Sequence, residues 1–178
     1  IGRYMTKEEA ENEKKKGNYV EYEEDQDGYR RIIASPKPID IYEIDAIEAL
    51  LDAGQIVIAA GGGGIPVMEQ GTTLKGASAV IEKDYTAAKL ADMVDASHLM
   101  ILTSKEQMET ADGQAIGKIS VSDAISLIDE NHFDAITTLP KVDASVSFVS
   151  SGEGRTAIIT KLENAYQGIK ERIGTIIK

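Results

Sequence analysis

The 178-residue sequence has no cysteine, only two histidines and no apolar run long enough to span a bilayer. Without cysteine there is no disulfide framework and no thiolate chemistry, which suits the reducing cytoplasm. The histidines, His98 and His132, have no spaced partner, so we expect no metal site among the side chains. Lysine and arginine (19) are outnumbered by aspartate and glutamate (30), which argues against nucleic acid or an anionic membrane as a partner.

What remains is typical of an ordered globular protein. The composition is 42% hydrophobic and 28% charged, which disfavours disorder. The length is sufficient for one sizeable core. No signal peptide is visible. The first residue is Ile1 rather than methionine, so we expect the natural protein to extend upstream.

Residues 1–38 predict a small unit of one helix and one hairpin. Thr6 and Glu9 have the spacing of a capping box, and the charged helix that they open ends at Gly17. Two alternating segments around an acidic turn then predict a solvated β-hairpin. Prolines on both sides of Lys37 mark a boundary. The hairpin strands are expected at residues 19–23 and 29–33.

Residues 39–178 alternate between helical and extended patterns, which predicts an α/β fold with a mostly parallel sheet between helical layers. Short runs rich in valine and isoleucine predict buried strands. Asp84 is the expected N-cap of the helix that follows it. We expect strands at 56–60, 98–103, 155–160 and 174–177, and helices at 41–53, 85–94, 120–130, 139–149 and 161–170.

Four consecutive glycines, Gly61, Gly62, Gly63 and Gly64, follow the predicted strand 56–60 directly. Glycine allows positive φ and a close approach of the backbone to a ligand. Bare N–H groups in such a turn can form a concave anion site, so the run is a candidate cradle for a phosphate or carbonyl group. It matches neither the Walker loop nor the dinucleotide fingerprint. The alternative interpretation is a flexible surface turn.

Three charged residues are candidates for chemistry because of their places at helix starts. Lys83 could neutralise a phosphoryl group, and Asp84 could orient that lysine or a second one through a charged hydrogen bond. Lys141 stands just inside a helix N-terminus, where a cation is misplaced unless an anion shares the site. The alternatives are a solvated pair with a plain aspartate N-cap, and an ordinary exposed lysine.

Several motifs follow one another in a specific order. They are Ser-Pro-Lys-Pro (35–38), the glycine run with its flanks (59–67), Leu-Lys-Gly (74–76), Ala-Val-Ile-Glu-Lys-Asp (79–84), Leu-Pro-Lys-Val (139–142) and Ala-Ile-Ile-Thr-Lys-Leu-Glu-Asn (157–164). In this order and spacing the chain resembles carbamate kinase, of the amino acid kinase family, from Ile1 to its end. The glycine run with its Ile-Pro-Val tail is the most specific of these motifs.

The resemblance implies the second half of a cytoplasmic, homodimeric kinase with a three-layer αβα sheet. Residues 1–38 would be a protruding lid-like subdomain and residues 39–178 the nucleotide-binding half. The first half, with a glycine-asparagine segment and a catalytic lysine, would lie upstream of Ile1. We therefore expect these residues alone to expose an apolar sheet edge where that half docks.

The resemblance also implies a reaction, in which ADP and carbamoyl phosphate give ATP and carbamate with Mg²⁺. By position, Asp84 would organise the lysines, while Lys83 and Lys141 would bind the transferring and nucleotide phosphates. The glycines from Gly61 to Gly64 would line the floor between the substrates. The residues implied near the nucleotide are Thr103, Leu139 and Pro140.

The sequence departs from the family pattern in four places. Glu82 replaces a usual aspartate, and the loops 104–108 and 135–138 differ on the nucleotide side. In the lid, residues 26–28 exchange a cation for an anion. A second hypothesis is therefore a kinase-like paralogue that binds a nucleotide or small metabolite with little or no turnover.

Overall fold

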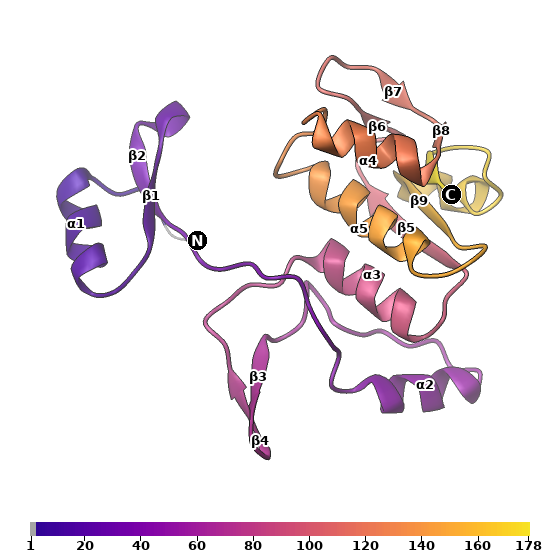
Figure 1. The fold of residues 1–178 in the computed structure, drawn as a ribbon, viewed down its shortest axis with the longest axis horizontal. Helices are drawn as coiled ribbons and strands as arrows, with labels where there is room; N and C mark the ends of the chain where they lie inside the picture. The colour runs from indigo at the N-terminus through magenta and orange to yellow at the C-terminus, as the bar shows by residue number, and fades with distance from the viewer. Residues whose placement is uncertain (1–2) are drawn as a thin grey trace. The chain divides into compact units, whose positions relative to one another are not determined.

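The computed structural model describes residues 3–178, which form two compact units (Figure 1). The first contains the chain up to Pro36 together with residues 65–80, and the second contains residues 37–64 and 81–178. The division after Pro36 lies close to the boundary expected from the two prolines. Residues 65–80 were expected in the second domain, and the structure groups them with the first unit instead.

The first unit contains the predicted helix and hairpin. Thr6 Oγ1 accepts the N–H of Glu9, while the Glu9 carboxylate accepts the N–H of Thr6 at 2.9 Å, so the capping box is confirmed. A second antiparallel hairpin around Gly71 was not predicted. The elements are α1 (Lys7–Lys15), β1 (Val20–Glu23), η1 (Glu24–Gln26), β2 (Gly28–Arg31), β3 (Val67–Gln70) and β4 (Thr73–Gly76).

The second unit is built on a four-stranded sheet with the order β5-β9-β10-β8. The pairs β5–β9 and β10–β8 are parallel, and β9–β10 is antiparallel. The sheet is therefore mostly parallel, as predicted. The elements are α2 (Ile44–Asp52), α3 (Lys83–Met93), β5 (His98–Thr103), β6 (Met108–Glu109), β7 (Ala115–Ile116), β8 (Lys118–Ile119), α4 (Val121–Asp129), α5 (Leu139–Ser150), β9 (Thr156–Lys161), η2 (Leu162–Asn164), α6 (Ala165–Gly168) and β10 (Thr175–Ile177).

Helices cover both faces of this sheet. On one face α3, α5 and α4 lie side by side (Figure 1), and the main core forms beneath them from residues such as Phe148, Ala157 and Ile159. Successive strand residues point to opposite faces, so Ile158 faces the other side, where it packs against Gly168 of α6. The result is the predicted three-layer αβα arrangement, although the helix expected over 161–170 is reduced to η2 and the short α6.

The strand predicted at residues 56–60 is wrong. This segment forms no strand and pairs with none among the described residues. Ile56 and Ile58 are each 97% exposed, whereas Val57 and Ala59 face an apolar groove of about 280 Å³ against α2 and α3. The apolar pattern predicts burial on both faces, but no strand in the described part of the chain lies hydrogen-bonded beside the segment to bury it. None of the helices between residues 3 and 178 has the length and apolar character of a membrane span.

Candidate active site

A nearly buried ion pair joins the first turns of α3 and α5. Lys141 Nζ donates to Asp84 Oδ2 at 2.8 Å, and the two side chains are only 14% and 6% exposed. Pro140 is accommodated in the first turn of α5, where no intrahelical N–H is needed. The two opposite charges are largely removed from water and compensate each other. This excludes the interpretation of Lys141 as an ordinary exposed lysine.

The aspartate does not cap its helix. The N-cap of α3 is Glu82, so the prediction of Asp84 as N-cap is wrong. Asp84 is instead the second residue of the helix, where a carboxylate is still favoured by the helix dipole. Because this position frees the carboxylate from backbone capping, its oxygen is available to Lys141.

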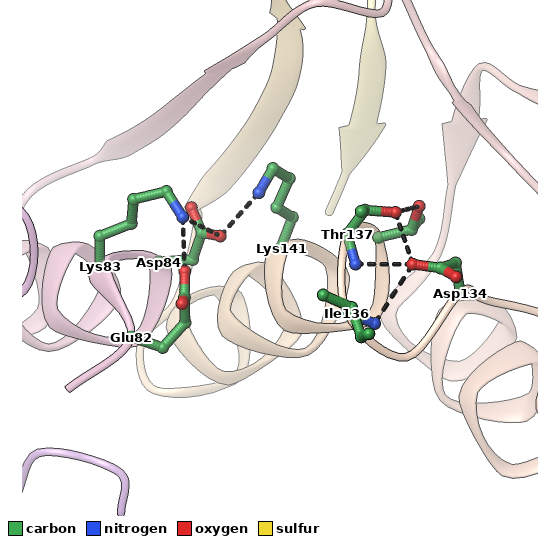
Figure 2. Close-up of polar contacts among 8 residues, drawn as sticks. Glu82, Lys83, Asp84, Asp134, Ile136, Thr137 and Lys141 are labelled. Carbon is green, nitrogen blue, oxygen red and sulfur yellow. Dashed lines mark hydrogen bonds and ion pairs between the residues drawn. The ribbon is translucent and has the colours of Figure 1, made fainter. Parts of the chain in front are cut away.

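Lys83 forms the exposed side of the same cluster. Its Nζ donates to Glu82 Oε1 at 2.6 Å and lies 3.8 Å from Asp84 Oδ2, with 56% of the side chain exposed. The hydrogen bond with Lys83 lowers the pKa of Glu82, and the same bond raises the pKa of Lys83. Both groups therefore remain charged at neutral pH. Figure 2 shows both ammonium groups directed at Asp84.

The glycine run packs against the start of α3. The carbonyl of Gly63 accepts the hydroxyl of Thr86 at 2.9 Å. Gly63 has φ +136°, and a Cβ on it would lie 2.1 Å from the carbonyl oxygen of Ile81, so only glycine fits. Within residues 3–178, the N–H groups of Gly62 and Gly64 have no hydrogen-bond partner, as an anion cradle requires.

The loop before α5 is organised by a residue that the sequence analysis missed. Asp134 Oδ1 accepts the N–H of Ile136 at 3.2 Å and both the N–H and the hydroxyl of Thr137, at 2.7 and 2.6 Å (Figure 2). Its carbonyl accepts the N–H groups of Thr138 and Leu139. The bonds to the carboxylate, chiefly that from the Thr137 hydroxyl, lower the pKa of Asp134. An aspartate two or three residues before such N–H groups is the usual signal for this turn.

The residues implied near the nucleotide fall into two places. Thr103 lines a hollow of about 540 Å³ with Ser104, Glu106 and Lys161, beyond the carboxyl ends of β5 and β9. This is where parallel α/β sheets bind ligands. Leu139 and Pro140 open α5, next to Lys141. The hollow contains neither of them among its lining residues.

No group of three or more histidine, cysteine, aspartate or glutamate side chains suited to a metal occurs within the described part of the chain. Mg²⁺ does not need such a cage in nucleotide sites, since substrate phosphates and one or two carboxylates hold it. A Mg²⁺ ion that arrived with a nucleotide would find one partly exposed carboxylate beside the lysines, that of Glu82.

The family model described as "Amino acid kinase family" matches residues 8–161. The chain belongs to the amino acid kinase family. A carbamate kinase-like protein of Escherichia coli, YqeA, is 49% identical, and a carbamate kinase of Clostridium perfringens is 45% identical. Each alignment includes 99% of this chain and 58% of the relative.

Solved structures agree with this family assignment. Carbamate kinase from Giardia lamblia bound to AMP-PNP superposes with a TM-score of 0.85 at 32% identity, over 99% of this chain and 57% of that one. A thiocarbamoylated form of the same enzyme gives a TM-score of 0.87. The predicted fold and the resemblance to carbamate kinase are thus confirmed. The chain spans about 58% of the length of the curated relatives it matches.

Proposed function

We propose that the protein containing these residues is a phosphotransferase of the carbamate kinase type. In the forward reaction the bond between phosphorus and the carbamate oxygen of carbamoyl phosphate breaks, and a bond forms between phosphorus and a terminal oxygen of ADP. The products are carbamate and ATP, and the reaction is reversible. Family membership and the 45% identity to a carbamate kinase support this proposal.

The observation on which the proposal rests is the Asp84–Lys141 pair with Lys83 beside it. Phosphoryl transfer needs little covalent chemistry from the protein, which mainly positions the reactants and neutralises charge. Asp84 holds Lys141 in one orientation, so its ammonium is fixed before substrate arrives. Lys83 is exposed enough to exchange Glu82 for a phosphate oxygen.

The remaining sites have separate proposed tasks. The free N–H groups of Gly62 and Gly64 would donate to the transferring group or to the carbonyl of the acceptor. Thr103, with Leu139 and Pro140, would contact the nucleotide, and Mg²⁺ bound to its phosphates would supply further neutralising charge. The relative whose structure contains AMP-PNP supports a nucleotide as one of the substrates.

The test uses the full-length protein, because the chain spans about 58% of its relatives. It is mixed with ADP, Mg²⁺ and carbamoyl phosphate, and ATP formation is followed. We expect ATP to form, and both Lys83→Ala and Lys141→Ala to abolish its formation while the protein stays folded. Turnover retained in Lys141→Ala would refute the role of that lysine. Lys118→Ala, which loses only an exposed ion pair with Glu171, serves as the control.

A second candidate is a protein that binds a nucleotide or small metabolite without turnover. The observation in its favour is Asp134, whose oxygens occupy the N–H groups of residues 136–139 in front of α5. Those groups are consequently not free to bind a phosphate. Nucleotide binding measured by calorimetry without any ATP formation would favour this candidate.

A further inference from the structure

A second polar link joins α3 and α5 beside the first. Tyr85 donates its hydroxyl to Asp143 Oδ2 at 2.8 Å, and Lys37 Nζ donates to the same oxygen at 2.6 Å. Lys37 Nζ also lies 4.6 Å from the centroid of the Tyr85 ring. The three side chains therefore form a closed triangle, in which each contacts both of the others.

The triangle lies next to the candidate active site along both helices. Tyr85 directly follows Asp84 on α3, and Asp143 is two residues beyond Lys141 on α5. Residues two apart on a helix differ by about 200° in direction, so Lys141 and Asp143 lie on different sides of α5. Val142, between them, is buried in the core. The two links thus join α5 to α3 on either side of the buried Val142.

Two polar links between α3 and α5 restrict the rotation of α5 about its axis more than one link does. Within the limits that its buried face allows, a helix held by a single ion pair can still shift about the bonded atoms, whereas a second link on a different side restricts that rotation. The roll of α5 determines where Lys141 Nζ stands relative to Asp84. The position of that ammonium therefore depends on Asp143 as well as on Asp84.

We propose that Asp143 is a positioning residue, which with Tyr85 and Lys37 fixes α5 against α3 and so sets the place of Lys141. Its effect on catalysis rests on the proposed function, but its effect on Lys141 does not. Asp143 touches no substrate in this role and acts only through Lys141.

The surroundings favour a permanent link rather than a switch. Burial first, and the hydrogen bond to Asp143 second, raise the pKa of Tyr85, so the phenol keeps its proton and remains a donor. Lys37 stands between Pro36 and Pro38, whose rings restrict the backbone on both sides. The charges facing the triangle are those of Glu82 and Asp84 on α3, which also oppose ionisation of the phenol.

The test measures Lys141 directly in the full-length protein. Tyr85→Phe removes one hydroxyl and keeps the ring. The protein is treated briefly with acetic anhydride, and acylation at Lys141 is quantified by mass spectrometry. We expect the acylation rate of Lys141 to rise about tenfold, because the loss of one hydrogen bond loosens its burial. Asp143→Leu should raise it further, and Asp143→Asn, which keeps an acceptor for the phenol, should raise it less.

The matched control is on the same helix. Asp92→Ala removes the acceptor of the 2.7 Å bond between α3 and Arg155 at the far end of α3, so it should lower the melting temperature without changing the acylation of Lys141. In the ATP-forming assay, Tyr85→Phe should lower kcat and leave the KM for ADP within about twofold.

An unchanged acylation rate at Lys141 in Tyr85→Phe, together with a lower melting temperature like that of Asp92→Ala, would overturn the inference and leave the link merely structural. If Asp143→Leu does not fold, Tyr85→Phe still decides the question. If the protein without substitutions forms no ATP, the proposed function fails. The acylation rate of Lys141 still tests the role of Asp143 in that case.

Discussion

Removing the charge of Asp84 tests whether the Asp84–Lys141 pair is a buried electrostatic unit. Asp84→Asn keeps the shape of the side chain but leaves Lys141, which is only 14% exposed, without the opposite charge that lay at 2.8 Å. Breaking a buried pair from one side costs about 3–5 kcal/mol. Because the ammonium retains some access to water, we expect the lower end, about 3 kcal/mol of unfolding free energy.

The reciprocal change should be milder. In Lys141→Met the carboxylate of Asp84 keeps Lys83 at 3.8 Å as a replacement cation, so we expect a loss of about 2 kcal/mol. The double variant leaves no unpaired charge, and we expect it to be no less stable than Lys141→Met alone. All three variants should be inactive in ATP formation, since neither single change leaves an oriented Lys141.

The assay is urea unfolding of the full-length protein and its three variants, analysed as a double-mutant cycle. Lys83→Met is the control, because its bond to Glu82 is exposed and should contribute less than about 1 kcal/mol. If the two single losses simply add in the double variant, the pair is not coupled, and the reasoning from burial is refuted.

Three further predictions concern the glycine run, the loop and the first unit. Gly63→Ala should lower the unfolding free energy by at least about 3 kcal/mol, because φ is +136° and the new Cβ meets a carbonyl oxygen. Gly62→Ala, which has open space around it, should lower it by less than about 1 kcal/mol. Urea unfolding measures both values. Asp134→Ala should lower the melting temperature more than Asp134→Asn, which keeps an acceptor for the loop before α5. Equal shifts would contradict the role of the Asp134 carboxylate in that loop. Bonds from Arg3 and the N–H of Thr6 lower the pKa of Glu9 from 4.5 to about 2. The capping box of α1 should therefore persist above pH 4.5 and be lost as the pH falls toward 2. The amide chemical shift of Thr6 in NMR should follow this titration, and Glu9→Gln should not show it.

Local signals in the sequence predicted the elements whose causes are local. The capping box at Thr6 acts within a few residues and is confirmed, and the helices expected at 120–130 and 139–149 are present as α4 and α5. The N-cap of α3 was misplaced by two residues because Glu82 and Asp84 are both acidic residues near the helix start.

Features that depend on distant residues were harder to predict. Asp84 and Lys141 were predicted as candidates, but 57 positions separate them, and only the packing of α3 on α5 shows that they bond. Tyr85 and Asp143 are 58 positions apart and carry no motif. The prediction of a buried strand at residues 56–60 was wrong for the same reason, because an apolar run does not show whether another strand will pair with it.

The charges of the cluster suggest how the site would respond to an anion. Glu82, Lys83, Asp84 and Lys141 sum to zero, so the cluster needs no counterion when the site is empty. A phosphoryl group entering the proposed site adds negative charge that one lysine must meet by exchanging its partner. Lys141 is nearly buried and held from both sides of α5, whereas Lys83 is 56% exposed and bonded to the adjacent residue. We therefore expect Lys83 to be the lysine that exchanges its partner, and Lys141 to supply fixed charge whose position is set before the substrate binds.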